Sequence, residues 1–229
     1  MRLYQFETHC HTAESSNCAA VPGAQAVDAM KQAGYIGTFI TDHFYSRFFN
    51  KRKLKHLDWE VQVDCYLEGY KAAASRGDEI DFKVFLGMEV QAEDSPFEYL
   101  VYGPDEAFIK RSGPFYKLST PELYALMHDN GFLMFQAHPF RFGLSPENPK
   151  YYDGIEIVNS QERNDSRNKR ALEFAKRNKV LTIAGSDVHV MSDIGKSGIM
   201  LPGSIGSTQD FVDYYKEVEA PELIITYGI

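Results

Sequence analysis

Histidines and carboxylates recur in this chain at the ends of short apolar segments that are typical of β-strands. Five of the seven histidines follow such segments: His9, His11, His43, His138 and His189. Two carboxylates stand in the same way, since Glu89 ends DFKVFLGME and Asp187 follows VLTIAG. Imidazole nitrogens and carboxylate oxygens together suit Zn, Mn or Fe ions. The pattern predicts a metal site, whereas His56 and His128 fall in helical stretches and are expected elsewhere.

The spacing within two segments indicates that their side chains share one site. In extended chain, residues i and i+2 point to the same side. His9 and His11 therefore present two imidazoles to one point, and Cys10 faces away. Asp187 and His189 repeat this arrangement. Bound divalent ions lower the pKa of water and can hold both sides of an in-line displacement at phosphorus, which predicts hydrolytic chemistry.

These residues need a scaffold that brings strand ends together. Strands are predicted over 3–9, 35–41, 81–89, 97–102, 132–136, 154–159, 180–184 and 223–226. Helices are predicted over 22–34, 57–77, 121–130 (with Thr120 as the N-cap), 163–178 and 207–218. This alternation favours an α/β fold with a parallel sheet closed into a barrel, where chemistry lies at the carboxyl ends of the strands. No GxGxxG follows the first strand, which argues against a dinucleotide-binding sheet.

Composition narrows the classes of partner. The 229 residues carry a formal charge of −8, which argues against an extended nucleic-acid-binding face. A small phosphorylated substrate remains compatible, because a metal and a few cations can dominate a pocket. We expect no membrane span and no signal peptide, since neither a long apolar run nor a cleavage pattern occurs. The three cysteines are expected as reduced thiols of a cytoplasmic protein.

Five short motifs occur in a fixed order along most of the chain. They are THCHT at 8–12, ITDH at 40–43, GME at 87–89, AHPF at 137–140 and GSDVH at 185–189, which leads into DIG at 193–195. The ordered set resembles the polymerase and histidinol phosphatase (PHP) family of metal-dependent phosphoesterases. The resemblance implies a distorted TIM-like (β/α)7 barrel, one domain over 1–229, with two or three divalent ions (Zn, Mn or Fe).

Carried over by position, the resemblance also implies which residues hold the metals. His9, His11, Glu89 and Asp187 would surround one ion, Glu89 would reach a second with His138, and His43 and His189 would serve a third. Asp42 would support catalysis by orienting a ligand, a common need in metal sites.

Two positions depart from the family pattern. Many members carry a further histidine in a segment that matches 97–103, where Tyr99, or alternatively Glu98, is the expected equivalent. Many also place a histidine or aspartate a few residues after the first motif, where this chain has Ser16, Asn17 and Cys18. The second and third metals would then each lack a ligand, unless Tyr99 or Cys18 replaces it. For Cys18 we expect a buried thiol instead.

Three cations near strand ends are candidates for binding the substrate: Arg141, Arg163 and Lys196. Arg141 is the first choice and is also expected to assist catalysis, because a guanidinium can hold phosphate through two parallel hydrogen bonds. Each cation could instead be a solvated surface residue. Glu156 and Asn159 share a strand end and are expected to contact the ligands or the substrate.

The residues and the resemblance together predict a metal-dependent hydrolase of a small phosphate ester, such as histidinol phosphate or a nucleotide, that uses a metal-bound hydroxide. The same ligands could hydrolyse an amide or a lactone, and an apolar pocket without cations would favour that alternative. A degenerate barrel that binds a partner is a third alternative. An open site argues against it, because structural zinc sites are usually closed by four ligands and rich in Cys.

Overall fold

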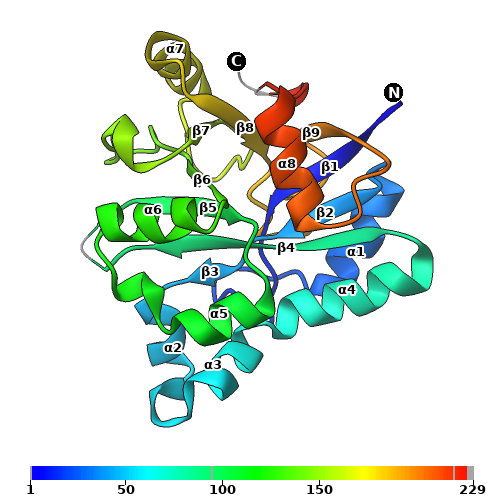
Figure 1. Cartoon of the computed structure of the whole chain (residues 1–229). Helices are drawn as coiled ribbons and strands as arrows, with labels where there is room; N and C mark the ends of the chain where they lie inside the picture. The colour runs from blue at the N-terminus through cyan, green and yellow to red at the C-terminus, as the bar shows by residue number, and fades with distance from the viewer. Residues whose placement is uncertain (1, 94, 219, 226–229) are drawn as a thin grey trace.

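A mixed β-sheet curves into a barrel in the computed structural model, which describes residues 2–93, 95–218 and 220–225 (Figure 1). The strands are β1 (Leu3–Cys10), β2 (Gly37–Ile40), β3 (His43–Phe44), β4 (Lys83–Gln91), β5 (Glu98–Tyr102), β6 (Leu133–Gln136), β7 (Gly154–Asn159), β8 (Leu181–Gly185), β9 (Ser197–Pro202) and β10 (Leu223–Ile225). Their order in the sheet is β10-β9-β1-β2-β4-β5-β6-β7-β8, and β3 pairs with β4. The predicted α/β barrel is confirmed.

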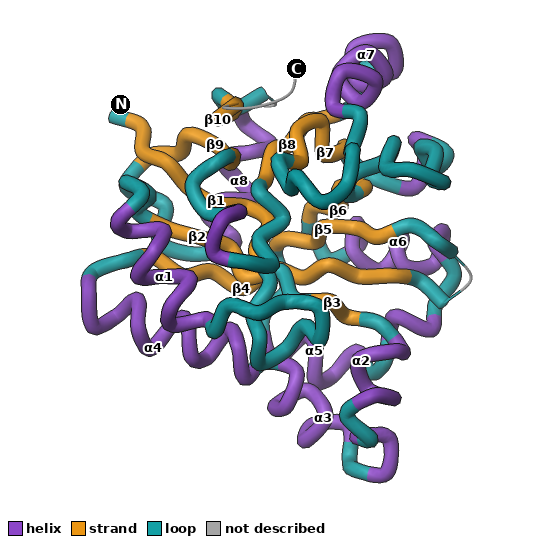
Figure 2. Tube along the Cα trace, turned by 180° about the vertical axis from the view of Figure 1, so that it is seen from behind, coloured by secondary structure: helices purple, strands orange, loops and turns teal. Residues whose placement is uncertain are grey.

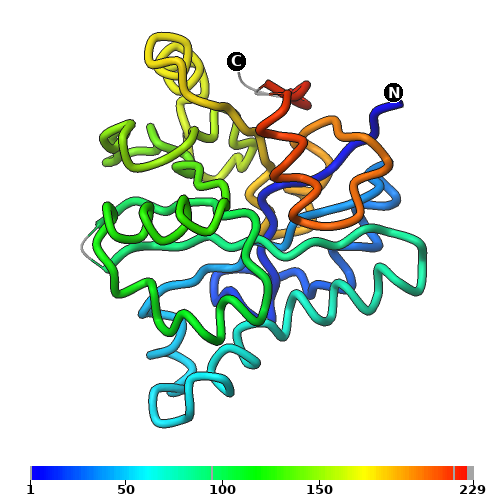
Figure 3. The backbone as a smooth tube through the Cα atoms, in the orientation of Figure 1, coloured from blue at the N-terminus to red at the C-terminus, as the bar shows by residue number. Residues whose placement is uncertain are grey.

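The chain that follows β8 closes the barrel at one end. Val188 and Cys10 form a parallel bridge, in which the Val188 N–H donates to the His9 carbonyl at 3.0 Å and the His11 N–H donates to the Val188 carbonyl at 3.0 Å. Figure 3 shows β1 beside the orange segment of β9, with which it pairs in antiparallel fashion. The first and fifth motifs are therefore hydrogen-bonded neighbours, although about 175 residues separate them in the sequence.

Helices cover the outside of the barrel. They are α1 (Gly23–Gln32), α2 (Ser46–Lys51), α3 (Trp59–Tyr66), α4 (Glu68–Ile80), α5 (Glu106–Ser112), α6 (Thr120–Asp129), α7 (Asn168–Asn178) and α8 (Thr208–Val218), with 3-10 turns at Leu54–His56, Phe115–Lys117, Pro149–Tyr151 and Met191–Asp193. Figure 1 and Figure 2 show α1 and α4 side by side from opposite directions. No helix in the described part of the chain is long and apolar enough to cross a membrane.

Several predicted elements need correction. The helix predicted over 57–77 is two helices, α3 and α4, that meet at Leu67, and the helix predicted over 163–178 begins only at Asn168. Ser119 rather than Thr120 precedes α6, and the Glu122 carboxylate accepts a hydrogen bond from the Ser119 N–H at 2.9 Å, as in a capping box. The short strands β3 and β9 and the helices α2 and α5 were not predicted. Residue 226, in the last predicted strand, lies outside the described residues.

The sheet is not wholly parallel, contrary to the prediction. β5 is antiparallel to both β4 and β6, and β9 is antiparallel to β1 and β10. The physical reason at β5 is the short connection after β4, because a parallel pair needs a crossover of a dozen or more residues.

Alternation along β4 and β5 separates two apolar clusters. Phe85 and Leu100 pack with Phe39 and with Phe211 of α8, whereas Tyr99 packs in a different cluster. α8 covers the end of the barrel where β4 begins (Figure 1). The opposite end, where β4 finishes, is left for the polar side chains.

Candidate metal centre

Donor atoms from β1, from β4 and from the segment after β8 converge at this end of the barrel. His9 Nε2 lies 3.1 Å from His11 Nε2, 3.3 Å from Glu89 Oε1 and 3.5 Å from Asp187 Oδ1. His11 Nε2 lies 3.3 Å from Glu89 Oε2 and 3.3 Å from Asp187 Oδ1. All four side chains are almost completely buried. The structure thus brings together the four residues predicted to surround the first ion.

These separations fit a bound divalent cation. Four donors placed tetrahedrally at about 2.0–2.1 Å from a zinc ion are about 3.3 Å from one another. His43 Nδ1 and Glu89 Oε2 are only 2.7 Å apart, yet both atoms are buried without a hydrogen bond. Burying polar atoms without hydrogen bonds lowers the stability of a protein, and coordination to a shared ion would remove this penalty.

Two further groups of potential ligands overlap the first. His43, Glu89 and Glu98 form one, and His11, His43 and His189 form the other. His138 Nε2 joins the former group at 3.1 Å from Glu89 Oε1 and 3.6 Å from Glu98 Oε2. All seven predicted metal ligands therefore lie in one continuous cluster, and their role as ligands stays a prediction.

The buried carboxylates and histidines of the cluster shift one another's pKa values, and the carboxylates would be stabilised by a bound cation. Burial raises the pKa of the Glu89 carboxyl, but the positive charges of His9 and His43 outweigh burial and hold that pKa well below its usual value. Burial disfavours charged His9, but the carboxylates of Asp187, Glu156 and Glu89 raise its pKa well above the ordinary value. Glu89 and Asp187, whose pKa values are both held low, stay ionised as metal ligands must be.

Glu156 orients two of the predicted ligands. Its Oε1 lies 2.9 Å from His9 Nδ1, and its Oε2 accepts a hydrogen bond from the main-chain N–H of His138 at 2.9 Å. A carboxylate on the second ring nitrogen leaves Nε2 of His9 for a metal. His138 and Asp187 have positive φ angles of 31° and 54°, a region that non-glycine residues rarely adopt. Strain of this kind persists where the surrounding structure enforces it, often at functional sites.

Asp42 acts on the cluster through a loop. Its carboxylate accepts hydrogen bonds from the Thr12 N–H at 2.7 Å and from the Ser16 hydroxyl at 2.6 Å. Ser16 Oγ is also 3.2 Å from His11 Nδ1. Gly69 of α4 presses on this loop, because a Cβ there would lie 1.8 Å from Thr12 Oγ1. Asp42 is therefore placed to position His11 through Ser16.

Comparison with known proteins agrees with this geometry. A family model described as PHP-associated matches residues 165–219, a span that contains Asp187 and His189. This match covers less than half of the chain and agrees with a PHP-like barrel. It is consistent with the resemblance that the five motifs indicated, and the last of those motifs lies within the matched span. No curated protein matches the chain in sequence.

The barrel fold is shared with solved structures at low sequence identity, and 23 chains of known structure match. A Bifidobacterium adolescentis protein assigned as a metal-dependent phosphoesterase is 17% identical, with a TM-score of 0.56 over 94% of this chain and 96% of that one. A lesion-specific endonuclease from Pyrococcus furiosus is 15% identical, with a TM-score of 0.64 over 96% of this chain and 57% of that one. An amidohydrolase from Chromobacterium violaceum is 14% identical, with a TM-score of 0.53 over 92% and 96%. At these identities the likeness shows the fold alone.

The structure corrects two expectations about departures from the PHP pattern. Tyr99 is fully buried and packs in the apolar cluster with Met88 and Val101, so Glu98 is the residue of β5 that faces the ligands. Cys18 is exposed rather than buried, and its thiol is within hydrogen-bonding reach of His43 and His189. Partial desolvation opposes ionisation of the thiol, but these two hydrogen bonds lower the pKa of Cys18 to about 6.

The three predicted substrate-binding cations are not equally close to this cluster of donors. Arg141 Nη2 donates to Asp187 Oδ2 at 2.7 Å, and its Nε is buried without a hydrogen bond. Arg163 pairs with Asp193 at 2.9 Å, and both arginines line a cavity of about 270 Å³ over the ligands. Lys196 pairs with Glu162 at 2.9 Å and is not among the residues that line this cavity.

Glu7 is a buried carboxylate that the sequence reasoning missed. Its Oε1 accepts hydrogen bonds from the main-chain N–H groups of Thr8, His9 and Ser186, each at 2.9 Å. It thereby ties β1 to the segment that carries Asp187. Its place two residues before His9, where it shares the side of the two imidazoles in extended chain, was the available signal.

Proposed function

We propose that this PHP protein is a metal-dependent phosphoesterase that acts on a small phosphate ester. The observation that carries the proposal is the overlap of three ligand groups directly beside the partly buried guanidinium of Arg141. Oxygen and nitrogen donors at this density suit Zn, Mn or Fe ions, and two or three ions would account for the seven predicted ligands. The proposal also includes a cytoplasmic location, which agrees with the three free cysteines. It further takes residues 1–229 as a single domain.

The residues have separable roles in this proposal. His9, His11, Glu89 and Asp187 would hold an ion that activates water and neutralises phosphate oxygens. Arg141 would bind the phosphoryl group, because Asp187 holds the guanidinium beside the cluster while its buried Nε has no hydrogen bond.

The cavity over the ligands indicates a small substrate. About 270 Å³ is slightly below the usual range for drug-sized ligands, and Gln161, Arg163 and Asn164 add polar groups to its wall. The net charge of −8 further favours a small phosphorylated molecule over an extended nucleic acid. Mononucleotides nevertheless belong among the test substrates, because a structural neighbour is an endonuclease.

The decisive experiment is a phosphate-release assay on protein whose metal content has been counted by elemental analysis. Histidinol phosphate and mononucleotides would be tested with Mn, Fe and Zn. We expect turnover by the wild type and by His128→Ala, whose histidine is 64% exposed on α6, and none by His9→Ala. Bound metal without phosphate release from any ester would contradict the phosphoesterase, and a protein that binds no metal would contradict the metal-dependent hydrolase altogether.

Amide or lactone hydrolysis is the second candidate, favoured by the amidohydrolase among the structural neighbours. The two candidates differ in their need for Arg141. Arg141→Leu should raise KM for a phosphate ester by at least tenfold, since a charge-assisted hydrogen bond contributes about 1.5–3 kcal/mol. Turnover of an amide or lactone panel that survives this substitution would favour the second candidate.

A further inference from the structure

One ligand group lacks a carboxylate of its own. His11, His43 and His189 come together with ring centroids 4.3 Å and 4.4 Å from His11. Nδ1 of His189 lies 3.0 Å from the Asp187 carbonyl, which leaves its Nε2 for a metal. His43 is 8% exposed, and its Nδ1 is buried without a hydrogen bond. The nearest carboxylates, Glu89 and Asp187, also lie against His9, so three imidazoles alone would leave a divalent ion here without an anionic ligand of its own.

The loop 13–18 approaches this group, but its acidic residue points elsewhere. Glu14 is the sole carboxylate in that stretch, and it accepts hydrogen bonds from the Gly23 N–H at the start of α1 at 3.0 and 3.2 Å. Ser16 is occupied as well, since its hydroxyl joins Asp42 at 2.6 Å and the His43 N–H at 3.1 Å.

Cys18 is the side chain of this loop that reaches the histidines. It lines the same cavity as His43 and His189, and its thiol contacts both imidazoles. The loop is held in place there, because the Ala20 N–H donates to the His189 carbonyl at 2.7 Å and the Ala13 N–H to the Val21 carbonyl at 2.9 Å. The thiol is thus fixed beside the two nitrogens.

We propose that Cys18 binds a divalent metal as a thiolate, together with His43 and His189. The inference rests on the proposed metal-dependent function and specifies one of its sites. Binding releases the thiol proton to solvent. A thiolate is a softer ligand than a carboxylate, so this position should prefer zinc to manganese, unlike an oxygen-rich site.

Cobalt reports the thiolate directly, because Co²⁺–sulfur coordination adds a charge-transfer band in the near ultraviolet. Metal-free protein would be titrated with Co²⁺ under a non-thiol reductant. We expect the band in the wild type and in Cys65→Ser, whose cysteine is on α3, away from the cluster. Cys18→Ser should lose the band and one equivalent of metal. Cys18→Asp should keep the metal without the band and shift the preference towards manganese.

X-ray absorption at the zinc edge of the wild type tests the same point without any substitution. Sulfur scattering at about 2.3 Å is expected. Full metal loading without the band and without sulfur scattering would overturn this inference and leave the proposed function standing. A band that persists in Cys18→Ser would also overturn it. Failure of the wild type to bind Co²⁺ or Zn²⁺ at all would overturn the proposed function together with it.

Discussion

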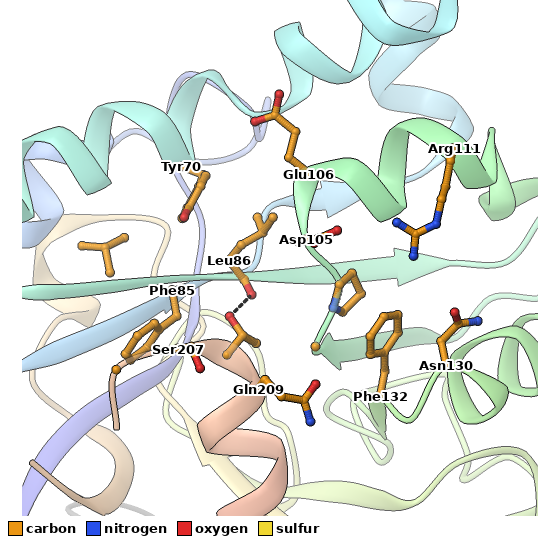
Figure 4. Close-up of a pocket in the computed structure, with 15 residues that line it drawn as sticks. Tyr70, Phe85, Leu86, Asp105, Glu106, Arg111, Asn130, Phe132, Ser207 and Gln209 are labelled. Carbon is orange, nitrogen blue, oxygen red and sulfur yellow. Dashed lines mark hydrogen bonds between the residues drawn. The ribbon is translucent and has the colours of Figure 1, made fainter. Parts of the chain in front are cut away.

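The two ends of the barrel differ in chemistry, and the end with the larger cavity is not the end with the predicted metal ligands. The end over the ligands holds a cavity of about 270 Å³, whereas the opposite end holds one of about 660 Å³ between α4, α5, α8 and the start of β4 (Figure 4). The larger cavity is lined by Leu86, Arg111 and Gln209, and Thr208 Oγ1 donates to the Leu86 carbonyl at 3.3 Å. Its titratable groups do not converge as ligand atoms among the described residues. We propose the end with the smaller cavity as the site of the chemistry, because buried donors meet there.

The largest expected effect at the ligand end comes from Glu89→Gln. Glu89 lies within 3.3 Å of His9, His11, His43 and His138 and so belongs to more than one ligand group. We expect phosphate release to fall about 1,000-fold or more, because a metal supplies several kcal/mol of transition-state stabilisation. Elemental analysis should show metal loss in parallel. If Glu89→Gln kept more than a tenth of the wild-type rate, the expectation that the reaction takes place at the ligand end would be wrong.

Metal removal should change the stability of the protein. Saturation at about 100 times the dissociation constant adds about 2.7 kcal/mol, which raises the melting temperature of a chain of this size by about 5–10 °C. Calorimetry before and after chelation measures the difference, and Asp187→Asn should abolish most of it. Identical melting curves with and without zinc would show that the ligand end has no bound ion.

A smaller effect is expected from Glu156→Gln, which removes the charge beside His9 Nδ1 and keeps the shape. Metal affinity should weaken about 10–100-fold, the usual cost of losing the partner of a metal-binding histidine. Competition with a chromophoric chelator gives the dissociation constant. An unchanged constant would mean that the barrel, and not Glu156, orients His9.

The smallest effect is expected at the larger cavity. Arg111→Ala removes a guanidinium 5.0 Å from the ring of Phe108 and should cost about 0.5–1 kcal/mol of stability. The turnover rate should stay within twofold of the wild type. A tenfold loss of activity at unchanged metal content would show that this end takes part in the reaction.

Local pattern in the sequence was enough to predict the donors and most of the scaffold. The i and i+2 spacing of His9 and His11 is a property of extended chain, so it survives folding unchanged. β7 was predicted at 154–159, the span that the structure shows, because its apolar run is short and bounded. Strand ends were located in the same way, and the structure places all seven predicted ligands together.

Tertiary structure decided what depends on partners distant in the sequence. Glu98 and not Tyr99 faces the ligands because β5 pairs antiparallel with β4 in a register that sets Glu98 opposite Gln91 and Tyr99 opposite Val90. A shift of one residue would exchange the two faces. Cys18 reaches His43 only because hydrogen bonds hold its loop against the Asp187–His189 segment. The sequence by itself determined which groups could bind metal; long-range pairing, whose register no local pattern encodes, decided which of them meet.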